Sequence, residues 1–353
     1  MKYFIRFIFM VTFLGLFTKT TTLTQATNFC NNVTEIPRLE CEALVKLYEN
    51  TQGSKWYYNL GWLSNLQPCS WSGISCEMND VYETHVTVIS LGADGISVGL
   101  TGPLPDELGN LTDLQVLDLR YNNLNGSIPT TLGKLVKLQK INLRFNNLTG
   151  QIPSELGSIS DLEYLILDSN HLNGPIPSSL GQLSKLKQLI LGDNNLTGSI
   201  PIELGNLTNL GIMYIYINQL SGNLPSSMGK LTMLKSLALQ KNNLSGPIPL
   251  EFGQLTQLIN LSLDSNKLNG QVPNELSNMI NLQQLFLHNN QLNGSLPQDL
   301  IKLNQLTHLS FNETELCEPL DIRFQNWLGT VKYVDRSGIK CSFVYLPIIS
   351  ISN

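Results

Sequence analysis

Histidine and charged residues are scarce in this sequence. Its 353 residues include four histidines, only 14% are charged, and the formal net charge is -5. The mild acidic excess argues against nucleic acid or an anionic membrane as a partner. The sequence also lacks a Gly-x-Ser-x-Gly, a His-Glu-x-x-His and a phosphate-binding loop. These absences predict a protein that is not an enzyme and that holds no cofactor and no metal.

Long apolar runs are missing beyond the start of the chain. Lys2 and Arg6 are followed by an apolar run from Phe7 to Phe17, and Thr24-Gln25-Ala26 supplies a small-residue cleavage site. This run is much shorter than the roughly 20 residues that cross a bilayer, so we interpret residues 1–26 as a signal peptide. The apolar tail, 342–353, is also too short for a span. We therefore expect a secreted, extracellular protein, with cell-surface or cell-wall association as a further hypothesis.

Cysteine is absent from the middle of the chain and is confined to its two ends. The six cysteines fit an oxidising compartment and suit disulfides that staple the ends. We expect the pairs Cys30–Cys41, Cys69–Cys76 and Cys317–Cys341, and Cys41–Cys69 remains an alternative.

The chain is rich in repetition. Residues 114–305 divide into eight units of 24, each of which opens with Leu at position 1. Position 9 is Asn, position 13 is Gly and position 16 is Pro in all eight units, from Asn122, Gly126 and Pro129 onward. Such an array predicts a solenoid, because a unit of this size cannot bury its own apolar face. We expect one continuous body with two caps.

The repeat predicts its own local structure. Positions 4 and 6 are apolar and positions 3, 5 and 7 vary, as in Leu117 and Leu119 around Asp118. This alternation predicts a strand with one buried face, and stacked units would form a parallel sheet with strands about 4.8 Å apart. The asparagine at position 9 would bond the backbone of its own and the adjacent turn. The glycine at position 13 permits positive φ, and the proline at position 16 ends any second strand. Position 20 is mostly Gly, but Ser277 and Ile301 replace it, so we expect the packing to change there.

Non-repeating segments flank the array. A degenerate first repeat and a partial last one extend the solenoid to 85–316. Residues 27–84 would form an N-terminal cap, with a helix over 37–50 and Trp56, Trp62 and Trp71 as its core. A sugar-stacking role for these tryptophans is the alternative. Residues 317–341 would form a C-terminal cap, in which Ile322, Phe324, Trp327 and Leu328 suit a short helix.

The segment LNGSIPTTLGKL (124–135), repeated in register, resembles the plant-type leucine-rich repeat, and PCSWSGISC in the N-terminal cap resembles the cap of that class. Relatives include polygalacturonase-inhibiting proteins and ectodomains of plant receptor kinases. The resemblance implies an α/β solenoid, a right-handed superhelix with a parallel β-sheet on its concave side and binding along that face. It does not name a ligand, because the motif describes the scaffold.

The variable strand positions carry our binding hypothesis. Apolar residues cluster there in the third to fifth repeats, and exposed apolar clusters often mark interaction sites. The candidate partner-binding residues are Tyr164, Ile166, Ile190, Ile212, Tyr214, Tyr216 and Ile217. The alternative is that β-branched and aromatic residues simply suit strands. We expect an extracellular protein or peptide ligand, such as a receptor.

Other surface features lead to alternative functions. Arg120, Lys140 and Arg144 would lie together and could seat an anion, unless Asp118 and Asp168 neutralise them. A cell-wall polysaccharide, or a wall-degrading enzyme inhibited by this chain, is therefore an alternative partner. A structural or ice-binding repeat surface is a third. Asn-x-Ser/Thr sites that predict glycosylation are Asn32, Asn110, Asn125, Asn147, Asn195, Asn206, Asn243, Asn260, Asn293 and Asn312.

Overall fold

The computed structural model describes residues 28–92, 95 and 97–341. The predicted signal peptide and the apolar tail lie outside these residues. The chain divides into two compact units, Met1–Leu172 and Asn173–Asn353, and each is described by itself. No helix of the described part is long and apolar enough to span a bilayer.

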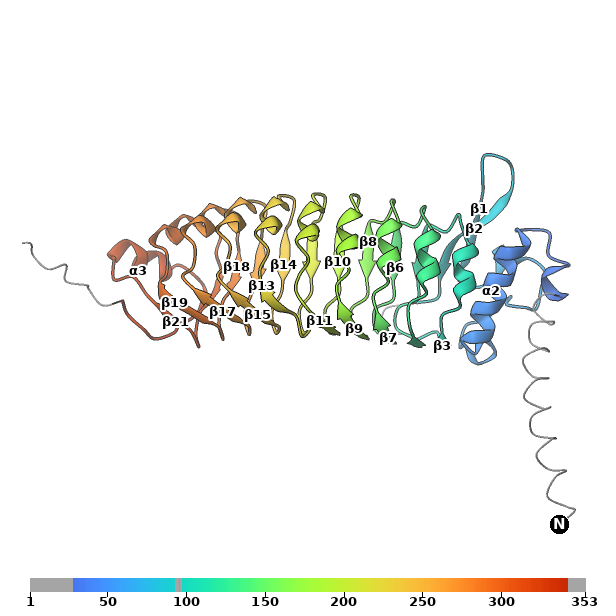
Figure 1. Ribbon diagram of the computed structural model, residues 1–353, viewed down its shortest axis with the longest axis horizontal. Helices are drawn as coiled ribbons and strands as arrows, with labels where there is room; N and C mark the ends of the chain where they lie inside the picture. Colours follow the sequence, from blue (N-terminus) through green and yellow to red (C-terminus); the bar gives the residue numbers. More distant parts are fainter. Residues whose placement is uncertain (1–27, 93–94, 96, 342–353) are drawn as a thin grey trace, which may run out of the picture. The chain divides into compact units, whose positions relative to one another are not determined.

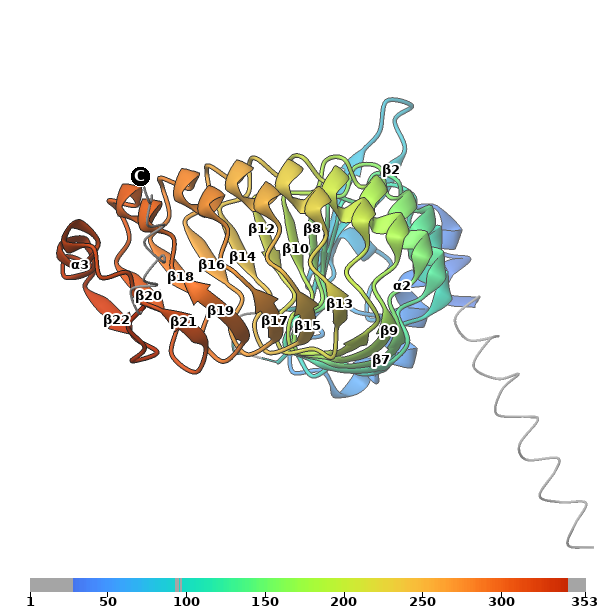
Figure 2. The same ribbon diagram turned by 60° about the vertical axis from the view of Figure 1, so that its left-hand side comes forward.

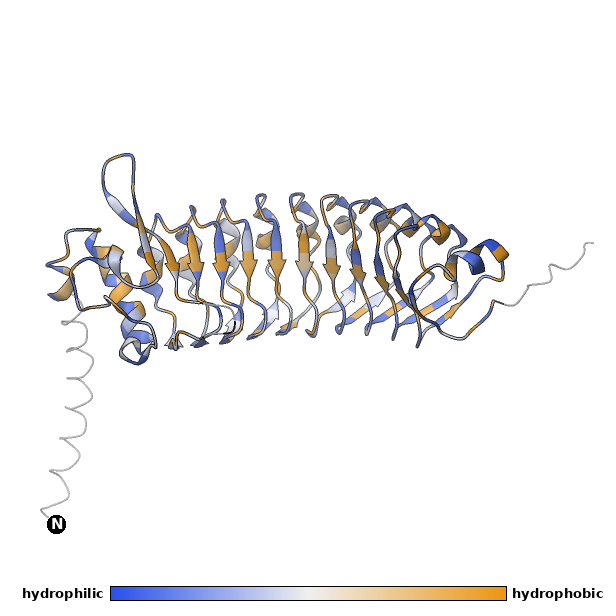
Figure 3. Ribbon diagram, turned by 180° about the vertical axis from the view of Figure 1, so that it is seen from behind, coloured by the Kyte–Doolittle hydropathy of each residue, from blue (hydrophilic) through white to orange (hydrophobic). Residues whose placement is uncertain are grey.

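Every repeat contributes one three-residue strand to a ladder that we call the main sheet. The central residue of the strand is buried, as Leu189 and Met213 are, because position 4 points into the core. Its neighbours at positions 3 and 5 point to the opposite side. We call this outward side, with position 7, the strand face. Hydrophobic residues recur at the same place in successive strands of each unit (Figure 3).

The main sheet of the first unit begins with an antiparallel hairpin and continues as a parallel ladder. Each strand pairs with the next at matched positions, so that Val116 lies opposite Lys140 and Lys140 opposite Tyr164. The strands, in order, are β1 (Ile74–Met78), β2 (Thr84–Ser90), β4 (Val116–Asp118), β6 (Lys140–Asn142) and β8 (Tyr164–Ile166) (Figure 1).

The second unit repeats this ladder without a hairpin. Its register advances by 24 residues per strand from β10 to β20, so Ile190 lies opposite Tyr214 and Tyr214 opposite Ala238, and by 25 residues at the last step, where His308 lies opposite Tyr333. The strands are β10 (Gln188–Ile190), β12 (Ile212–Tyr214), β14 (Ser236–Ala238), β16 (Asn260–Ser262), β18 (Gln284–Phe286), β20 (His308–Ser310) and β22 (Tyr333–Asp335) (Figure 2). The predicted parallel sheet of repeated strands is confirmed in both units.

A second, lateral strand and a 3-10 turn complete each repeat. The lateral strands are β3 (Thr101–Pro103), β5 (Asn123–Gly126), β7 (Asn147–Gln151), β9 (His171–Pro175), β11 (Asn195–Thr197), β13 (Ser221–Asn223), β15 (Asn243–Gly246), β17 (Lys267–Gly270), β19 (Gln291–Ser295) and β21 (Glu315–Cys317). The 3-10 turns are η3 (Asp106–Asn110), η4 (Thr130–Lys134), η5 (Ser154–Ser158), η6 (Ser178–Gln182), η7 (Ile202–Asn206), η8 (Ser226–Lys230), η9 (Leu250–Gln254), η10 (Asn274–Asn278) and η11 (Gln298–Lys302). The proline at position 16 lies beyond the end of the lateral strand of its repeat, as expected, and it immediately precedes each of η4 to η11.

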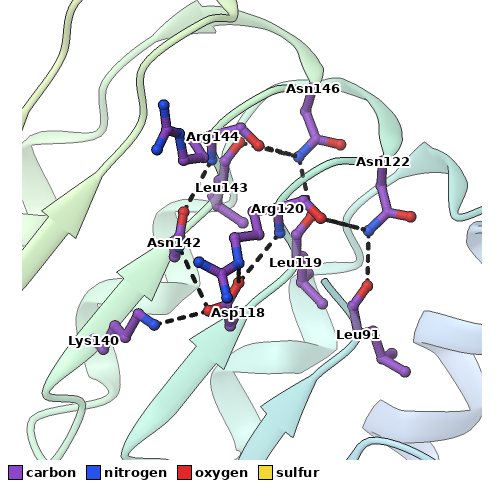
Figure 4. Close-up of polar contacts among 10 residues, drawn as sticks. All are labelled: Leu91, Asp118, Leu119, Arg120, Asn122, Lys140, Asn142, Leu143, Arg144 and Asn146. Carbon is purple, nitrogen blue, oxygen red and sulfur yellow. Dashed lines mark hydrogen bonds and ion pairs between the residues drawn. The ribbon is translucent and has the colours of Figure 1, made fainter. Parts of the chain in front are cut away.

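The asparagine at position 9 links each repeat to the one before it. Asn146 Nδ2 donates to the carbonyl oxygens of Leu119, 3.0 Å away in the preceding repeat, and of Leu143, 3.0 Å away in its own. Its Oδ1 accepts a hydrogen bond from the Leu124 N–H at 3.0 Å. Asn122 makes the equivalent contacts to Leu91 and Leu119 (Figure 4). The amide therefore pairs backbone groups that the tight coil would leave without partners.

Two glycine columns have separate functions. The glycines at position 13 have positive φ, from 73° at Gly126 to 80° at Gly294, as the sequence predicted. The glycines at position 20 instead permit close approach of neighbouring 3-10 turns. A Cβ on Gly205 would lie 2.7 Å from the carbonyl carbon of Ser227 in the next repeat. The backbones of η7 and η8 therefore fill the space that a side chain would need.

The N-terminal cap is built on helix α2 (Arg38–Asn50), which packs against η3 (Figure 1). Two short 3-10 turns, η1 (Gly53–Lys55) and η2 (Pro68–Ser70), follow it. Trp56, Trp62 and Trp71 are at most 4% exposed and contact one another in series, edge-to-face at 5.0 Å between the centroids of the first two rings and tilted at 4.9 Å between the last two. Their burial leaves no stacking surface for a sugar and fits the core role. The disulfides Cys30–Cys41 and Cys69–Cys76 are the expected pairs.

A buried ionisable pair joins this cap to the first repeat. Glu40 of α2 is 2% exposed, accepts the Val86 N–H at 2.8 Å and lies 2.5 Å from His85 Nδ1. Burial raises the pKa of Glu40, outweighing the opposing effects of Val86 and His85. Burial by itself lowers the pKa of His85. The hydrogen bond and negative charge of Glu40, followed by the charges of Asp113 and Glu83, together have the larger effect and raise this pKa above 6.5. Asp113 is itself paired with Lys137.

We expect this pair to make the cap less stable as the pH rises. A raised His85 pKa means that protonated imidazole is favoured in the folded state, so its contribution is complete below pH 6.5 and is lost as pH rises through the higher folded pKa. The thermal midpoint, followed by cap tryptophan fluorescence, should decrease as the pH rises above 6.5 and through the raised folded pKa of His85. His85→Gln should flatten this dependence, whereas His171→Gln on β9 should leave it. A parallel pH profile for His85→Gln and the unmodified chain would contradict the assignment.

The C-terminal cap is helix α3 (Ile322–Leu328) with β22. Asp321 caps α3 by accepting the N–H groups of Arg323 and Phe324 at 3.0 Å and 3.2 Å. Phe324, Trp327 and Leu328 are buried as expected, but Ile322 is 70% exposed because it occupies the first, outward position of the helix. The expected disulfide Cys317–Cys341 ties the ends of the cap together.

Candidate functional site

The strand face of the second unit carries five of the seven predicted partner-binding residues. Ile190, Ile212, Tyr214 and Tyr216 are half-buried, and Ile217 is 40% exposed. The sequence predicted fuller exposure, but neighbouring strands only about 4.8 Å apart cover the flanks of each side chain. We call these five residues the apolar patch.

The backbone register brings the members of the apolar patch together. Ile190 and Tyr214 are direct partners in β10 and β12. The Tyr214 hydroxyl donates to Ser236 Oγ at 3.1 Å, which orients its ring across β14. The rings of Tyr214 and Tyr216 lie 6.2 Å apart at 57°, a tilted arrangement within the range of favourable aromatic pairs.

Gly192 shapes the patch although it was not among the predicted residues. A Cβ on Gly192 would lie 2.7 Å from Cζ of Tyr216, so the tyrosine ring occupies the place of the missing side chain. The following repeats hold Tyr216, Gln240 and Asp264 at this same position 7. The signal in the sequence was a glycine at a strand-face position, next to an aromatic residue in the following repeat.

Ile217 holds a strained backbone conformation. Its φ is 48°, in the left-handed region, which is unusual for a β-branched residue and costs of order 1–3 kcal/mol. Position 8 has positive φ in neighbouring repeats too, at Asp193 (53°) and Lys241 (56°). The scaffold therefore imposes the conformation, and an isoleucine there gives an exposed apolar side chain beside Tyr216. The sequence did not predict positive φ at this position, because its residue types vary.

The other two predicted residues belong to the first unit. Tyr164 and Ile166 lie on β8, half-buried, where their partners in β6 are Lys140 and Asn142. The other five predicted residues lie together in the second unit, so the candidate site consists of these five.

The predicted cationic cluster in the first unit is neutralised by buried carboxylates, of which Figure 4 shows Asp118 with Lys140 and Arg120. Lys140 Nζ lies 2.8 Å from Asp118 Oδ2, and Arg120 Nε lies 3.4 Å from Asp118 Oδ1. An Arg144 terminal nitrogen lies 3.0 Å from Asp168 Oδ2. Asp118 and Asp168 are 3% and 1% exposed, so the cations compensate charges that would be costly to bury alone. This geometry fits the alternative interpretation, in which Asp118 and Asp168 neutralise the three cations, better than it fits an anion-binding site.

One histidine has partners that the sequence did not predict. His288 Nδ1 lies 3.0 Å from Ser310 Oγ, and its Nε2 lies 3.4 Å from Asp264 Oδ2. Ser310 carries a hydroxyl group that a histidine base could in principle activate. Ser310 is nevertheless only 3% exposed, and its hydroxyl also donates to Asn312 Oδ1 at 2.9 Å. A buried hydroxyl with a competing acceptor does not meet the geometry of an activated nucleophile. Among the described residues, no group of three His, Cys, Asp or Glu side chains is arranged to hold a metal.

The predicted glycosylation sites concentrate on the lateral strands. The exposed members of that set are Asn125, Asn147, Asn195, Asn243 and Asn293. Asn125 and Asn147 are direct partners in β5 and β7. Outside the lateral strands, Asn32 and Asn206 are exposed and Asn110 is half-buried. Asn260 and Asn312 are half-buried on the strand face, but neither belongs to the apolar patch.

A model of the leucine-rich repeat matches seven segments of the chain, 113–135, 137–159, 161–183, 185–207, 233–255, 257–279 and 281–303. The matched segments do not include residues 208–232, which contain Ile212 to Ile217. In that repeat Met213 and Ile215 replace the leucines of positions 4 and 6. The repeat that carries most of the apolar patch therefore departs furthest from the common pattern.

Several solved structures similar to the chain are plant proteins. The ectodomain of the Arabidopsis thaliana receptor kinase GASSHO1/SCHENGEN3, in complex with CASPARIAN STRIP INTEGRITY FACTOR 2, is 36% identical over 76% of this chain, with a TM-score of 0.71. The Arabidopsis receptor kinase HAESA, in complex with the peptide hormone IDA and the co-receptor SERK1, is 31% identical over 72%, with a TM-score of 0.52. The chain spans 31% and 50% of these two structures. A plant ice-binding protein is 25% identical over 88% of this chain and 100% of its own, with a TM-score of 0.70.

Proposed function

Because this chain belongs to the plant-type leucine-rich repeat family, we propose that it is a secreted or cell-surface recognition protein that binds a peptide or protein ligand on the strand face of its second unit. One observation carries the proposal: Ile190, Tyr214, Tyr216 and Ile217 present apolar surface together on that face. Tyrosines of this kind are favoured anchors at interfaces, because they combine a large apolar ring with a polar tip.

Two further features support the same conclusion. HAESA, which shares this fold, is a receptor kinase in complex with a peptide hormone. The three disulfides fit an extracellular location.

The double change Tyr214→Asp with Ile190→Asp tests the proposal. It places two charges where the ligand needs apolar surface, and loss of two anchors should weaken binding at least about a hundredfold. The immobilised chain would be used to capture ligands from extracellular fluid, with identification by mass spectrometry and Kd measurement on the ligand found.

The control introduces the same charges on exposed apolar residues elsewhere in the second unit. Ile202→Asp with Leu250→Asp changes the 3-10 turns η7 and η9, where these side chains are 67% and 56% exposed. This variant should bind normally. Circular dichroism and thermal midpoints establish that both variants fold. Capture of the same ligand with equal affinity by Tyr214→Asp/Ile190→Asp would refute the proposal.

A specific observation also favours ice binding as a second candidate. The lateral strands of the second unit present small polar, mostly uncharged side chains at regular intervals, among them Thr197, Ser221 and Asn269, all exposed. Ser221 and Asn269 lie in one sheet of lateral strands, β13 to β21, whose strands are about 4.8 Å apart, so their polar groups form a regular array, whereas Thr197 lies on β11 in another sheet. The likeness to the plant ice-binding protein supports the same candidate.

A thermal-hysteresis assay on the enzymatically deglycosylated chain tests this candidate, because glycans on Asn195, Asn243 or Asn293 would cover the lateral strands. Ser221→Lys with Asn269→Lys places charges in the array and should abolish any effect on ice growth. Tyr214→Asp with Ile190→Asp, on the strand face, should leave the effect unchanged. Absence of hysteresis in the unmodified chain removes the candidate.

A further inference from the structure

The strand face changes character immediately beyond the apolar patch. The backbone N–H of Ile217 donates to the carbonyl oxygen of Gln240 at 3.0 Å, and that of Lys241 donates to the carbonyl oxygen of Asp264 at 3.1 Å. Tyr216, Gln240 and Asp264 therefore occupy successive repeats at the same position 7. The aromatic patch is followed by an amide and then by a carboxylate.

Both polar residues have acceptor capacity to spare. Gln240 Oε1 is buried and has no hydrogen-bond partner among the described residues. An unpaired buried acceptor destabilises the folded state, so its retention requires an explanation. The Asp264 carboxylate has Ser265 Oγ at 3.3 Å and His288 Nε2 at 3.4 Å, both long contacts through the same oxygen, Oδ2.

The charge of this face is also unbalanced. None of the positions 3, 5 and 7 from Gln188 to Asn312 holds lysine or arginine, although Lys241 occupies position 8, the position of Ile217 in the preceding repeat. In the first unit, by contrast, Asp118 and Asp168 are each paired with a cation on the same face. Within the described part of the chain, the carboxylate of Asp264, whose side chain is 11% exposed, pairs with His288 and with no lysine or arginine side chain.

We propose that Tyr216, Gln240 and Asp264 form a subsite for a cationic side chain, arginine or lysine, of the peptide that binds the apolar patch. The inference rests on the proposed peptide-binding function and names the chemistry of its ligand. The carboxylate of Asp264 and the amide oxygen of Gln240 accept hydrogen bonds from the cation, and Tyr216 borders the subsite on the side of the apolar patch.

The repeat spacing fixes where the basic residue falls in the ligand. Tyr216 and Asp264 are two strands apart, which is roughly 10 Å at about 4.8 Å per strand. An extended peptide that crosses the strands advances about 3.3 Å per residue. The basic residue therefore lies about three residues from the apolar residue that contacts Tyr214 and Tyr216.

Selection from a displayed library of random peptides on the full secreted chain tests the subsite. The peptides are displayed internally, so a free amino terminus cannot supply the cation. Enriched sequences should pair an aromatic or aliphatic residue with arginine or lysine about three residues away. Asp264→Asn should weaken the best peptide tenfold or more, as loss of a charged hydrogen bond does. Replacing the basic residue of the peptide by norleucine should then have little further effect on this variant.

Two more variants separate a binding role from a structural one. Gln240→Leu removes the unpaired acceptor, so it should weaken the peptide while leaving the thermal midpoint unchanged or higher. Glu275→Gln, an exposed carboxylate on η10, is the matched control and should change neither quantity.

The possible failures are distinguishable. Enriched peptides that depend on Tyr214 but lack a basic residue, or that bind Asp264→Asn equally well, overturn the subsite and leave the proposed function standing. No enrichment, or full binding by Tyr214→Asp with Ile190→Asp, overturns the proposed function and the subsite with it.

Discussion

Asn242→Ala is expected to lower the free energy of unfolding by roughly 3 kcal/mol. Asn242 is 8% exposed, and its Nδ2 donates to the carbonyl oxygens of Ile215 at 3.0 Å and Leu239 at 3.1 Å. Its Oδ1 accepts the Leu220 N–H at 3.1 Å. Removing the amide leaves the Leu220 N–H buried without an acceptor. The carbonyl oxygen of Ile215 then keeps one side-chain donor, Asn218, and that of Leu239 keeps one, Asn266.

Chemical denaturation of Asn242→Ala measures this effect, and hydrogen exchange at the Leu220 amide locates it. Asn269→Ala is the control, because Asn269 is exposed on β17 and lies outside any glycosylation motif. Asn242→Asp retains an acceptor for Leu220 but faces two carbonyl oxygens with a carboxylate, so it should be at least as destabilising. Equal stability of Asn242→Ala and Asn269→Ala would show that the asparagine column does not hold the repeats together.

The scaffold was predictable because the residues that determine its structure recur at fixed positions in every repeat. A residue type that recurs eight times at one position reports a constraint on every repeat, as Asn, Gly and Pro do at positions 9, 13 and 16. The two caps were predictable for a different reason. Cysteines and tryptophans concentrate there, and their burial and pairing follow from their chemistry.

The site was less predictable because it depends on side chains that do not repeat. Register alone brought Ile190 beside Tyr214, and the register follows from the repeat length. The repeat pattern could not reveal that Tyr216 lies over Gly192 or that Gln240 Oε1 lacks a partner among the described residues, since both depend on side-chain rotamers. Positive φ at Ile217 was hidden for a related reason. The turn geometry imposes it on whatever residue occupies position 8, so no glycine marks the place.

Position 20 offers a second test of what sets the repeat spacing. Gly205→Val should cost about 2–3 kcal/mol, because a Cβ there would overlap the carbonyl oxygen of Ser227 and lie 2.7 Å from its carbonyl carbon. These are backbone atoms of the next 3-10 turn and cannot rotate away as a side chain can. Relief requires η7 and η8 to separate, which would also loosen the lateral strands that connect to them.

Two comparisons decide whether the effect comes from close approach or from loss of glycine as such. Gly211→Ala should be neutral, because its Cβ would meet only Lys187 O, at 3.6 Å. Ser277 occupies position 20 in the seventh repeat and is 2% exposed, so the spacing there already admits a side chain. Ser277→Gly should therefore change the thermal midpoint far less than Gly205→Val does. If all three variants had the same thermal midpoint, close approach of the 3-10 turns would not set the spacing between repeats. The main sheet alone would then have to set it.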